Sequence, residues 1–462
     1  MIKQFIKSSF VLSISAALLL GCKTDEPLPQ LLAGFTSTSL GLTLTDNQAN
    51  TTIELSRTAS EATRITLTIG DEVNATYGVD YTTEPTADNH VITLEIPAGS
   101  ASADLVINKL KNPEFEEIKS FNITLNEVSN DGSTGTNNVL AVSFEENPTS
   151  SGAVIAPEVG GPEQPNQVFI DLSKQKTTTV AKGSWDLAFS NDGQFRVMLN
   201  YATYSMARAT GQTDLASVSD ALVTEDYKNE MQAGEINTEY MDDPSGDLSK
   251  TAIAEISETD AENFVYVINR GQLDTEPATE RGFVKARITR DGADFVITYG
   301  NINDVSGFTS VTIPESADTH FTYFSFDDGV VDVAPAKDSW DFEMTTFLNE
   351  YPSGDDVYSY KFKDFALTNQ GSVKITSVDI TDEVTYDNFT SDNLSTITLE
   401  DNRLGIGGSW RVFDFGTFTY TINSAIFYVI EDTDGNHYKL KFTQMVDEQG
   451  NRGYPEFVYE LL

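Results

Sequence analysis

The sequence predicts an all-β protein, and three features indicate this class. Short runs of alternating apolar and polar residues recur from about Phe35 onward, as in TTIELSR, RITLTI and HVITLEI. Gly, Asn, Asp and Pro separate these runs at spacings of roughly ten residues, which is typical of antiparallel strands joined by turns. Helical periodicity is hard to find anywhere in the chain.

The composition favours a soluble, exposed protein with enough apolar material for several cores. The 462 residues carry a formal net charge of −42 and a pI near 4.1, and 39% of them are hydrophobic. This charge repels phosphate backbones and argues against nucleic-acid binding, which needs a basic surface. The length favours two or three domains.

The start of the chain looks like an export signal followed by a surface tether. Residues 1–21 combine a positively charged beginning with an apolar run too short to span a bilayer comfortably. The run ends in Leu-Leu-Gly-Cys, which resembles a bacterial lipobox, so we expect lipidation at Cys22 and an anchor without a transmembrane helix. The alternative is a Cys that happens to follow a simple signal peptide. Cys22 is the only Cys, so no disulfide within the chain is expected.

The sequence of the tether, residues 22–34, indicates where in the cell the protein is located. KTDEP directly after Cys22 resembles the surface-export signal of Bacteroidetes lipoproteins. The resemblance implies an outer-membrane protein, held by its lipid and exposed on the cell surface.

Residues 35–147 are expected to form a β-sandwich. YGVDY, ITLEIPAGSASADLVI and EFEEIKSFNITL follow one another as in Calx-beta domains, which this block resembles. Calcium-binding members hold the ion with loop carboxylates, because Ca²⁺ prefers six to eight oxygen ligands. The alternative is a solvated acidic rim on a domain that serves as a stalk. The acids that the resemblance matches to calcium ligands are Asp80, Glu114, Glu116 and Glu117.

Residues 148–167 are expected to be a linker. The stretch is rich in Pro, Gly and Ser and poor in bulky residues that could bury a face.

A longer unit occurs twice in the rest of the chain. SWDLAF returns as SWDFEM, with Trp185 and Trp340 155 positions apart. FVYVI, FVKARI and DFVITY correspond in order and approximate spacing to IFYVI, HYKLKF and EFVYEL. This period predicts a duplicated domain, with copies at 168–310 and 311–462. On a strand, Trp-Asp-Leu sends Trp and Leu to one face and Asp to the other, as in a core Trp anchor.

Both copies resemble the HmuY family of Bacteroidetes haem-binding lipoproteins. The likeness rests on YFSFDDGVVDVAPAKDSWDF, IGGSWRVFDF, FYVIEDTDGNHYKLKF, the final GYPEFVYELL and the opening of the first copy, and it covers about residues 165–462. It implies an all-β haemophore that takes haem from haemoproteins and passes it to a TonB-dependent outer-membrane receptor. The expected architecture is an N-terminal Calx-beta-like sandwich followed by two related antiparallel HmuY-like β domains.

The resemblance also implies an apolar slot for haem and two axial ligands to iron, His or Met. Counted from GSW at 408–410, a position that carries an axial His in a family member is Phe415 here, which cannot bind iron. Met231 and Met241 lie where the other ligand is expected, on a segment that could close over the ring as a mobile loop. The alternative is that these two residues fill gaps in a core.

The other residues able to bind iron are expected to have structural roles. His90, His320 and His437 are expected at the surface or in turns, and Met198 is expected to pack in a strand.

No motif indicates an enzyme. The chain lacks a G-x-S-x-G elbow, an H-E-x-x-H pair, a Cys pair and a P-loop, and its carboxylates are too numerous to single out an acid and base pair. The alternative to haem capture is a non-haem accessory or adhesion lipoprotein that binds a protein or a glycan at the cell surface. Exposed aromatic side chains would serve stacking on sugars as well as on porphyrin.

Replacing Cys22 by Ser should abolish lipid attachment, because the thiol is the only acceptor for the lipid. Detergent partitioning measures this change. The variant should stay in the aqueous phase or remain unprocessed, and a variant that partitions wholly into detergent would contradict the lipoprotein prediction.

Overall fold

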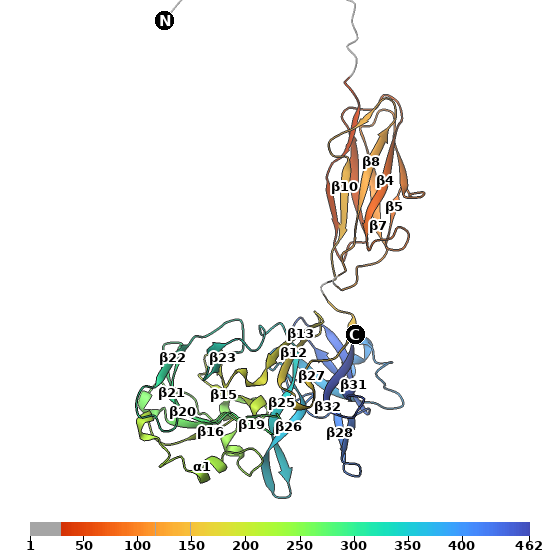
Figure 1. Ribbon diagram of the computed structural model, residues 1–462. Helices are drawn as coiled ribbons and strands as arrows, with labels where there is room; N and C mark the ends of the chain where they lie inside the picture. Colours follow the sequence, from red (N-terminus) through yellow and green to blue (C-terminus); the bar gives the residue numbers. More distant parts are fainter. Residues whose placement is uncertain (1–28, 116, 148) are drawn as a thin grey trace, which may run out of the picture. The chain divides into compact units, whose positions relative to one another are not determined.

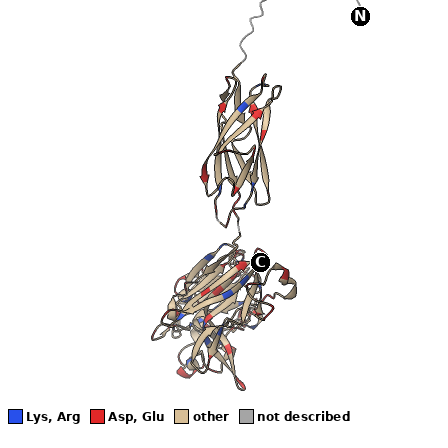
Figure 2. Cartoon of the chain, turned by 90° about the vertical axis from the view of Figure 1, so that its right-hand side faces the viewer, with Lys and Arg blue, Asp and Glu red and all other residues tan. Residues whose placement is uncertain are grey.

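Two units make up the chain in the computed structural model, Met1–Glu146 and Asn147–Leu462, of which residues 29–462 apart from Glu116 and Pro148 are described (Figure 1). Strands dominate both units, which confirms the all-β class. Asp and Glu residues occur in both units (Figure 2). Among the residues that the structure describes, no helix is long and apolar enough to cross a membrane.

The first unit is a β-sandwich. Its strands form two five-stranded sheets, with the orders β5-β7-β3-β1-β9 and β2-β10-β8-β4-β6. Most neighbours are antiparallel, but β1 pairs parallel with β9 and β2 parallel with β10. The strands are β1 Leu32–Phe35, β2 Ser39–Leu42, β3 Gln48–Leu55, β4 Thr63–Val73, β5 Tyr81–Glu84, β6 Val91–Ile96, β7 Ser102–Lys109, β8 Ser120–Val128, β9 Ser133–Thr134 and β10 Val139–Phe144.

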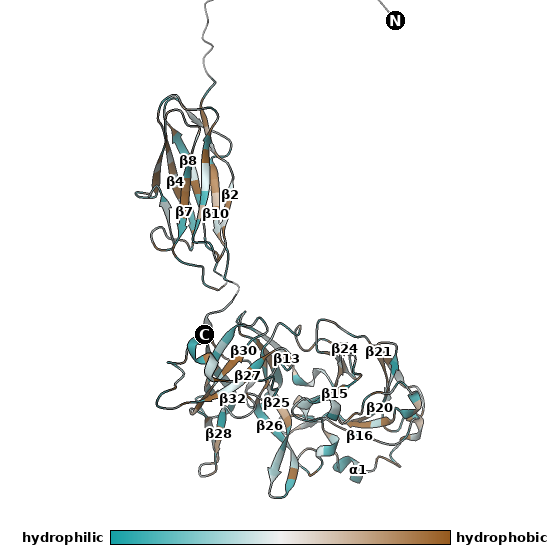
Figure 3. Ribbon diagram, turned by 180° about the vertical axis from the view of Figure 1, so that it is seen from behind, coloured by the Kyte–Doolittle hydropathy of each residue, from teal (hydrophilic) through white to brown (hydrophobic). Residues whose placement is uncertain are grey.

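The core of the sandwich follows from the period of two in its sequence. Along β6 and β10 every second side chain is buried and the others are exposed. This alternation is visible as changing hydropathy along the strands (Figure 3). At the centre, the rings of Tyr81 and Phe121 stack with centroids 3.8 Å apart. The sandwich expected for this block is therefore confirmed.

The second unit contains the repeated sequence, and its strands fall into two series. The first half, residues 152–300, holds β11 Gly152–Ile155, β12 Asn166–Asp171, β13 Lys176–Ala181, β14 Leu187–Ser190, β15 Val197–Leu199, β16 Met206–Ala209, β17 Val265–Asn269, β18 Gln272–Leu273, β19 Thr279–Glu280, β20 Phe283–Asp291 and β21 Asp294–Gly300. The second half, residues 309–461, holds β22 Thr309–Ile313, β23 Phe321–Ser325, β24 Gly329–Val331, β25 Phe342–Ser353, β26 Asp356–Thr368, β27 Lys374–Asp379, β28 Arg411–Asp414, β29 Thr419–Ile422, β30 Ile426–Glu431, β31 His437–Val446 and β32 Arg452–Leu461.

Short helices join these strands. They are α1 Glu225–Asn229 and the 3₁₀ turns η1 Gly161–Glu163, η2 Lys182–Ser184, η3 Tyr201–Thr203, η4 Leu215–Ser217, η5 Thr238–Tyr240, η6 Leu248–Lys250, η7 Asp260–Glu262 and η8 Ser391–Thr396.

The two halves build matching sheets by exchanging strands. One five-stranded sheet has the order β16-β17-β20-β21-β22, and its counterpart has the order β27-β30-β31-β32-β11. In each, the last strand comes from the other half. The four-stranded sheets β15-β14-β23-β24 and β26-β25-β12-β13 are mixed in the same way. Each half therefore completes the sheets of the other.

The repeated Trp-Asp pair lies where the halves meet. The Asp186 amide donates to Phe324 O at 2.8 Å, and a carboxylate oxygen of Asp186 accepts the Phe326 amide at 2.9 Å. In the other half, the Asp341 amide donates to Ile170 O at 2.7 Å, and its carboxylate accepts the Leu172 amide at 2.7 Å. The repeated Asp thus binds the backbone of the opposite half each time.

Within each half, an Asn binds the backbone around the repeated Trp. The Asn200 side chain donates to the carbonyl oxygens of Lys182 and Trp185 at 2.8 and 2.7 Å. The Asn369 side chain donates to those of Lys337 and Trp340, both at 2.8 Å. The repeated sequence is thus accompanied by a repeated pattern of hydrogen bonds around the Trp-Asp pair.

The predicted division into separate copies is not confirmed. Residues 168–310 and 311–462 lie in one unit, because β12 pairs with β25 and β14 pairs with β23 across that boundary. Most of the stretch expected to be a linker also belongs to this unit. Its β11 pairs with β32, Val159 is buried in the core, and the Gln164 side chain donates to Asp364 at 2.6 Å. The Pro- and Gly-rich composition of this stretch did not predict its four-residue strand, β11.

The two repeated Asp residues differ in charge environment. Asp186 is fully buried, and both its oxygens accept from Arg270 at 2.9 Å, while Arg281 lies 2.9 Å away as well. Asp341 is also buried, and burial raises its pKa to about 8, with Asp432 adding to the rise against the Leu172 amide. Asp186 is thus paired with two guanidinium groups, whereas Asp341 is held mainly in its protonated form at neutral pH.

Replacing Asp186 by Asn should destabilise the second unit by about 3–5 kcal/mol, because it leaves Arg270 and Arg281 without their buried counter-ion. Replacing Asp341 by Asn should cost about 1 kcal/mol or less, because a largely neutral group is exchanged for another. Urea unfolding followed by tryptophan fluorescence measures both, since the three Trp residues all lie in this unit.

The Asp341 variant also has a pH signature. The pKa of Asp341 is higher in the folded protein than in the unfolded chain. The contribution of Asp341 to the free energy of unfolding is therefore complete below about pH 4 and is lost as the pH rises through 8. The parent should therefore lose more stability than the Asp341→Asn variant between pH 5 and 9. Equal losses, or a harmless Asp186→Asn change, would contradict this account.

Candidate functional site

Strands β28 and β29 form a hairpin that carries exposed aromatic rings. We call residues 411–422 the aromatic hairpin. At its tip, Phe415 and Phe418 are 74% and 78% exposed, and both contact Phe413, with ring centroids 4.9 and 6.2 Å away. The tip is held by the Asp414 side chain, which accepts the Gly416 amide at 2.7 Å. Exposed rings of this kind offer a stacking surface to a ligand.

The base of the aromatic hairpin is fixed to the rest of the unit. The Arg411 guanidinium donates to the carbonyl oxygens of Lys363 and Asp364 at 2.8 and 3.0 Å. The Tyr420 ring lies 4.0 Å from the Arg452 guanidinium, which is itself paired with Asp364 at 2.5 Å. A fixed base below an exposed tip presents the two Phe rings in a defined place.

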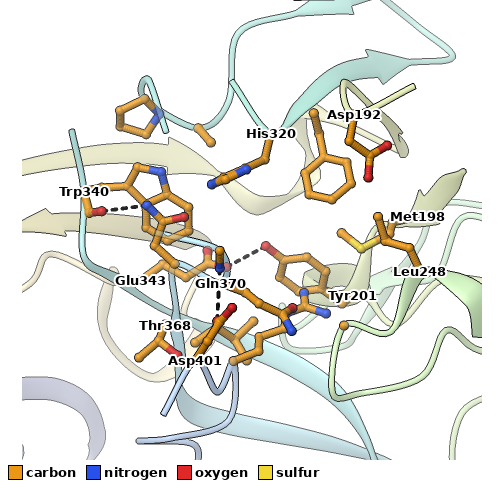
Figure 4. Close-up of a pocket in the computed structure, with 18 of the residues that line it drawn as sticks. Asp192, Met198, Tyr201, Leu248, His320, Trp340, Glu343, Thr368, Gln370 and Asp401 are labelled. Atoms are coloured by element: carbon orange, nitrogen blue, oxygen red, sulfur yellow. Dashed lines mark hydrogen bonds between the residues drawn. The ribbon is translucent and has the colours of Figure 1, made fainter. Parts of the chain in front are cut away.

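A cavity of about 250 Å³ lies where the two halves meet (Figure 4). Trp340 and His320 lie to one side of it and Met198 and Leu248 to the other. Tyr201 is among the aromatic residues of the wall. The full lining is Asp192, Met198, Tyr201, Gly246, Leu248, His320, Phe321, Tyr323, Ala334, Pro335, Trp340, Glu343, Leu367, Thr368, Asn369, Gln370, Gly371, Asp401 and Arg403.

The acid at this cavity is engaged by neighbouring side chains. Glu343 is buried and accepts from the Tyr201 hydroxyl at 2.5 Å and from the Gln167 amide at 3.0 Å. Burial raises the pKa of Glu343 to about 7, although the Tyr201 hydrogen bond and the Arg403 charge oppose the rise. The carboxyl group is therefore about half protonated at neutral pH.

The cation at this cavity, Arg403, is only 8% exposed. Its guanidinium carbon lies 4.6 Å from the centre of the Tyr201 ring and 5.4 Å from that of Phe347. Within the described part of the chain, no hydrogen bond or ion pair reaches this guanidinium. Sequence reasoning missed Arg403, because a single Arg among polar residues carries no local signal.

The structure separates the three His residues. His90 lies in the first unit beside Glu72 at 3.1 Å, and His437 lies 3.5 Å from Glu431, both as expected of surface or turn residues. His320 instead lines the cavity, with its Nε2 3.1 Å from the Ser372 hydroxyl. Burial lowers the pKa of His320, and the charge of Lys337 lowers it further, which favours the neutral ring.

The Met residues chosen from the sequence are core residues in the structure. Met231 and Met241 are buried in one apolar cluster with Tyr204 and Met206. This corrects the expectation of a mobile loop, and their assignment as iron ligands stays a prediction without geometric support. Met198, expected only to pack, is buried and also lines the cavity.

The acids matched to calcium ligands do not form a calcium site among the described residues. Lys119 is buried, and its ammonium lies 3.1 Å from Asp80 and 2.9 Å from Glu117, and it donates to the Asn74 carbonyl at 2.7 Å. Glu114 pairs with Lys111 at 2.8 Å. Outside the gaps at 1–28, 116 and 148, no group of three or more His, Cys, Asp or Glu side chains is placed to hold a metal. The described partner of Asp80 and Glu117 is thus the Lys119 ammonium, and the calcium assignment, which includes Glu116, stays a prediction without geometric support.

Two predicted site residues lie outside the described residues. They are Cys22, the expected lipid acceptor, and Glu116, the fourth acid of the calcium prediction.

Comparison with protein families supplies the assignment of the second unit. The family described as HmuY protein matches residues 163–459, almost two thirds of the chain. The chain belongs to the HmuY family. One match runs through both halves, so the HmuY domain of this chain consists of the two strand-exchanging halves together. Two complete HmuY copies are not confirmed.

Comparison with curated proteins finds no match, and three solved structures that match have low TM-scores. The apo form of the Calx CBD1 domain is 14% identical with a TM-score of 0.23, covering 26% of this chain and 98% of its own. The Calx CBD2 domain is 12% identical with a TM-score of 0.21, covering 25% and 86%.

A two-domain protein of unknown function from Bacteroides fragilis NCTC 9343 is 9% identical, with a TM-score of 0.20 and coverages of 27% and 52%. Scores this low carry no argument, so the Calx-beta likeness of the first unit stays a resemblance.

The described residues provide only part of a site for the haem that the HmuY family implies. Phe415, which the resemblance matches to an axial His of a family member, is exposed on the aromatic hairpin and cannot bind iron. The cavity of about 250 Å³ lies below the roughly 300–1,000 Å³ of sites for drug-sized ligands, so a whole haem does not fit inside it. The residues present fit the face of a porphyrin ring at the aromatic hairpin, but they do not supply iron ligation there.

Replacing Lys119 by Met should destabilise the first unit by about 3 kcal/mol or more, because Asp80 and Glu117 lose their buried counter-ion. The first unit has no Trp. The shift should therefore be seen in far-ultraviolet circular dichroism, while the fluorescence transition of the second unit stays in place.

Lys111→Met is the matched control, since its pair with Glu114 is exposed and should leave the transition unchanged. If calcium raises the stability of the parent protein, Lys119 does not take the place of the ion and this account is wrong.

Proposed function

We propose that the protein is a cell-surface lipoprotein that captures haem or a related tetrapyrrole and passes it to a TonB-dependent outer-membrane receptor. The observation that carries this proposal is the HmuY match over residues 163–459. The expected lipid anchor at Cys22 supports the location. The proposed role is binding and transfer, and it includes no catalysis.

The aromatic hairpin is the proposed contact with the ring. Phe415 and Phe418 are large apolar side chains exposed to solvent, and covering them with a flat apolar ring removes both surfaces from water. The clamped base, with Arg411 and Arg452, places positive charge beneath the tip. The propionates of a tetrapyrrole are complementary to this charge in a chain that is otherwise strongly acidic.

Because Phe415 supplies no iron ligand, the affinity in this binding mode comes mainly from contacts with the porphyrin ring and less from the metal. An iron-free porphyrin presents the same face and the same propionates as haem. We therefore propose that this protein discriminates less between haem and porphyrin than a family member with two axial ligands would.

The first unit is proposed to act as a spacer between the anchor and the binding unit. Its buried Lys119 pairs with Asp80 and Glu117, two of the acids that the calcium prediction names. This role agrees with a sandwich that has its own closed core.

Hemin titrated into the purified protein should shift the Soret band with a defined stoichiometry, and iron-free protoporphyrin IX should bind within about tenfold of hemin. A tenfold ratio corresponds to about 1.4 kcal/mol. Phe415→Ala combined with Phe418→Ala should weaken both ligands at least tenfold by removing the stacking surface.

The control is Tyr351→Ala combined with Tyr360→Ala, which removes two exposed rings from the β25–β26 hairpin instead and should leave binding unchanged. No spectral change beyond that of an unrelated acidic protein would reject haem capture and favour the protein- or glycan-binding alternative. Hemin binding that is far tighter than porphyrin binding would show that an iron ligand exists and that the proposed mode is wrong.

A further inference from the structure

The cavity between the two halves contains a buried guanidinium, that of Arg403, for which the described residues supply no ion pair and no hydrogen-bond acceptor. Arg403 is more than nine-tenths buried and lines the cavity, and its guanidinium lies over the rings of Tyr201 and Phe347, which contact each other edge to face. Burying an unpaired charge is costly, so such groups are normally paired or hydrogen-bonded. The described residues give Arg403 neither kind of partner.

Other buried cations of the second unit show that the lack of a partner is specific to Arg403. Each of them is held by oxygen atoms: Lys182 by Asp274, Arg270 by Asp186 and Asp327, Lys285 by the carbonyls of Val218, Ile302 and Asp304, and Lys439 by Glu460. The chain has 71 acidic residues, so acids are not scarce. Asp242 and Glu343 lie close enough to feel the Arg403 charge, but no described acid lies within ion-pair distance of its guanidinium, so its donors are left for a ligand.

Glu343 does not fill this role. Its two carboxylate oxygens accept from Tyr201 and Gln167, and no ion pair joins it to Arg403 in the described structure. The two rings contact the guanidinium without accepting a hydrogen bond from its N–H groups, so its planar fork of donors has no acceptor among the described residues. A guanidinium fork matches the two oxygens of a carboxylate.

The rest of the cavity wall is suited to an aromatic body. Tyr201, Tyr323, Phe321 and Trp340 contribute ring surfaces, and Met198 contributes a polarisable thioether that packs well against rings. An apolar cavity of roughly 150 Å³ is known to accept benzene. The volume here, about 250 Å³, has room for a one-ring or two-ring molecule and not for a tetrapyrrole.

We propose that this cavity binds a small aromatic carboxylate of one or two rings, with the carboxylate on Arg403 and the rings between Trp340 and Met198. This site is separate from the aromatic hairpin, and it goes beyond the proposed function because it needs neither haem nor iron. His320, which lines the cavity and also an adjoining surface hollow, lies at the entrance.

The carboxylate could also come from a second source, a propionate of haem bound at the cavity mouth. The two sources share the same chemistry at Arg403 but differ in competition. A free aromatic carboxylate that occupies the cavity leaves hemin binding at the aromatic hairpin unchanged. A haem propionate at Arg403 would exclude the small ligand.

Isothermal titration of the full chain with 2-naphthoate tests the proposal, with 2-naphthamide as the neutral analogue of the same shape. We expect one 2-naphthoate per chain and at least tenfold weaker binding of 2-naphthamide. Because this comparison uses the unaltered protein, it does not depend on the folding of any variant.

Arg403→Met should weaken 2-naphthoate at least tenfold and leave 2-naphthamide within about threefold, while Arg403→Lys should give an intermediate loss because it keeps the charge and loses the fork. Arg208→Met is the matched control. The Arg208 guanidinium also stacks on two rings, those of Tyr227 and Tyr240 at 4.3 and 5.0 Å, but it is paired with Glu230 and does not line the cavity. This variant should bind 2-naphthoate as the parent does.

Three results would overturn the proposal. They are no heat of binding for 2-naphthoate, equal binding of the acid and the amide, and loss of 2-naphthoate binding after saturation with hemin. The first two reject an anion site at Arg403, and the third assigns the site to haem. None of them affects the test of haem capture, which is read from the Soret band and from Phe415 and Phe418.

Discussion

The second unit depends on a reciprocal set of hydrogen bonds between its two halves. Asp186 binds the backbone at the end of β23, and Asp341 binds the backbone at the end of β12. Through these contacts each half places a strand in the sheets of the other, so neither half has a complete sheet alone. An isolated half would expose unpaired strand edges and leave buried polar groups without partners. The duplicated sequence therefore folds as one domain.

The repeated Asp makes the same backbone hydrogen bonds in both halves, but the charged groups around it differ. Asp186 faces Arg270 and Arg281, whereas Asp341 has no cation beside it among the described residues and shares its surroundings with Asp432. A buried carboxyl group needs either a counter-ion or a proton, and each half uses one of these solutions. The backbone hydrogen bonds were kept in both halves while the charges around them diverged. Stability of the two junctions should consequently respond differently to pH.

Sequence patterns identified the strands and the repeat but not the neighbours of each strand. A period of two shows which face of β6 or β10 is buried, yet it does not say which strand lies alongside, and the exchange of β11 and β22 between halves has no local signal. The strand β11 was missed because Pro and Gly surround its four residues. The roles of Lys119 and Arg403 depend on contacts across the fold, so residue type alone could not predict them. Met231 was misplaced for the same reason, since burial in a core is decided by distant residues.

The two equivalent Trp residues differ in how they meet the cavity. Trp185 is fully buried, and its indole N–H donates to Gln167 at 2.7 Å, which in turn donates to Glu343. Trp340 occupies the matching place, but its indole N–H has no partner in the described structure and its ring lines the cavity. Glu343 belongs to the second half and lines the cavity, so the hydrogen-bonded chain from Trp185 ends at the cavity wall, whereas Trp340 meets the cavity with an indole N–H that has no described partner. The cavity leaves the junction between the halves intact, because the backbone bonds of Asp186 and Asp341 join the halves and do not involve the indole rings.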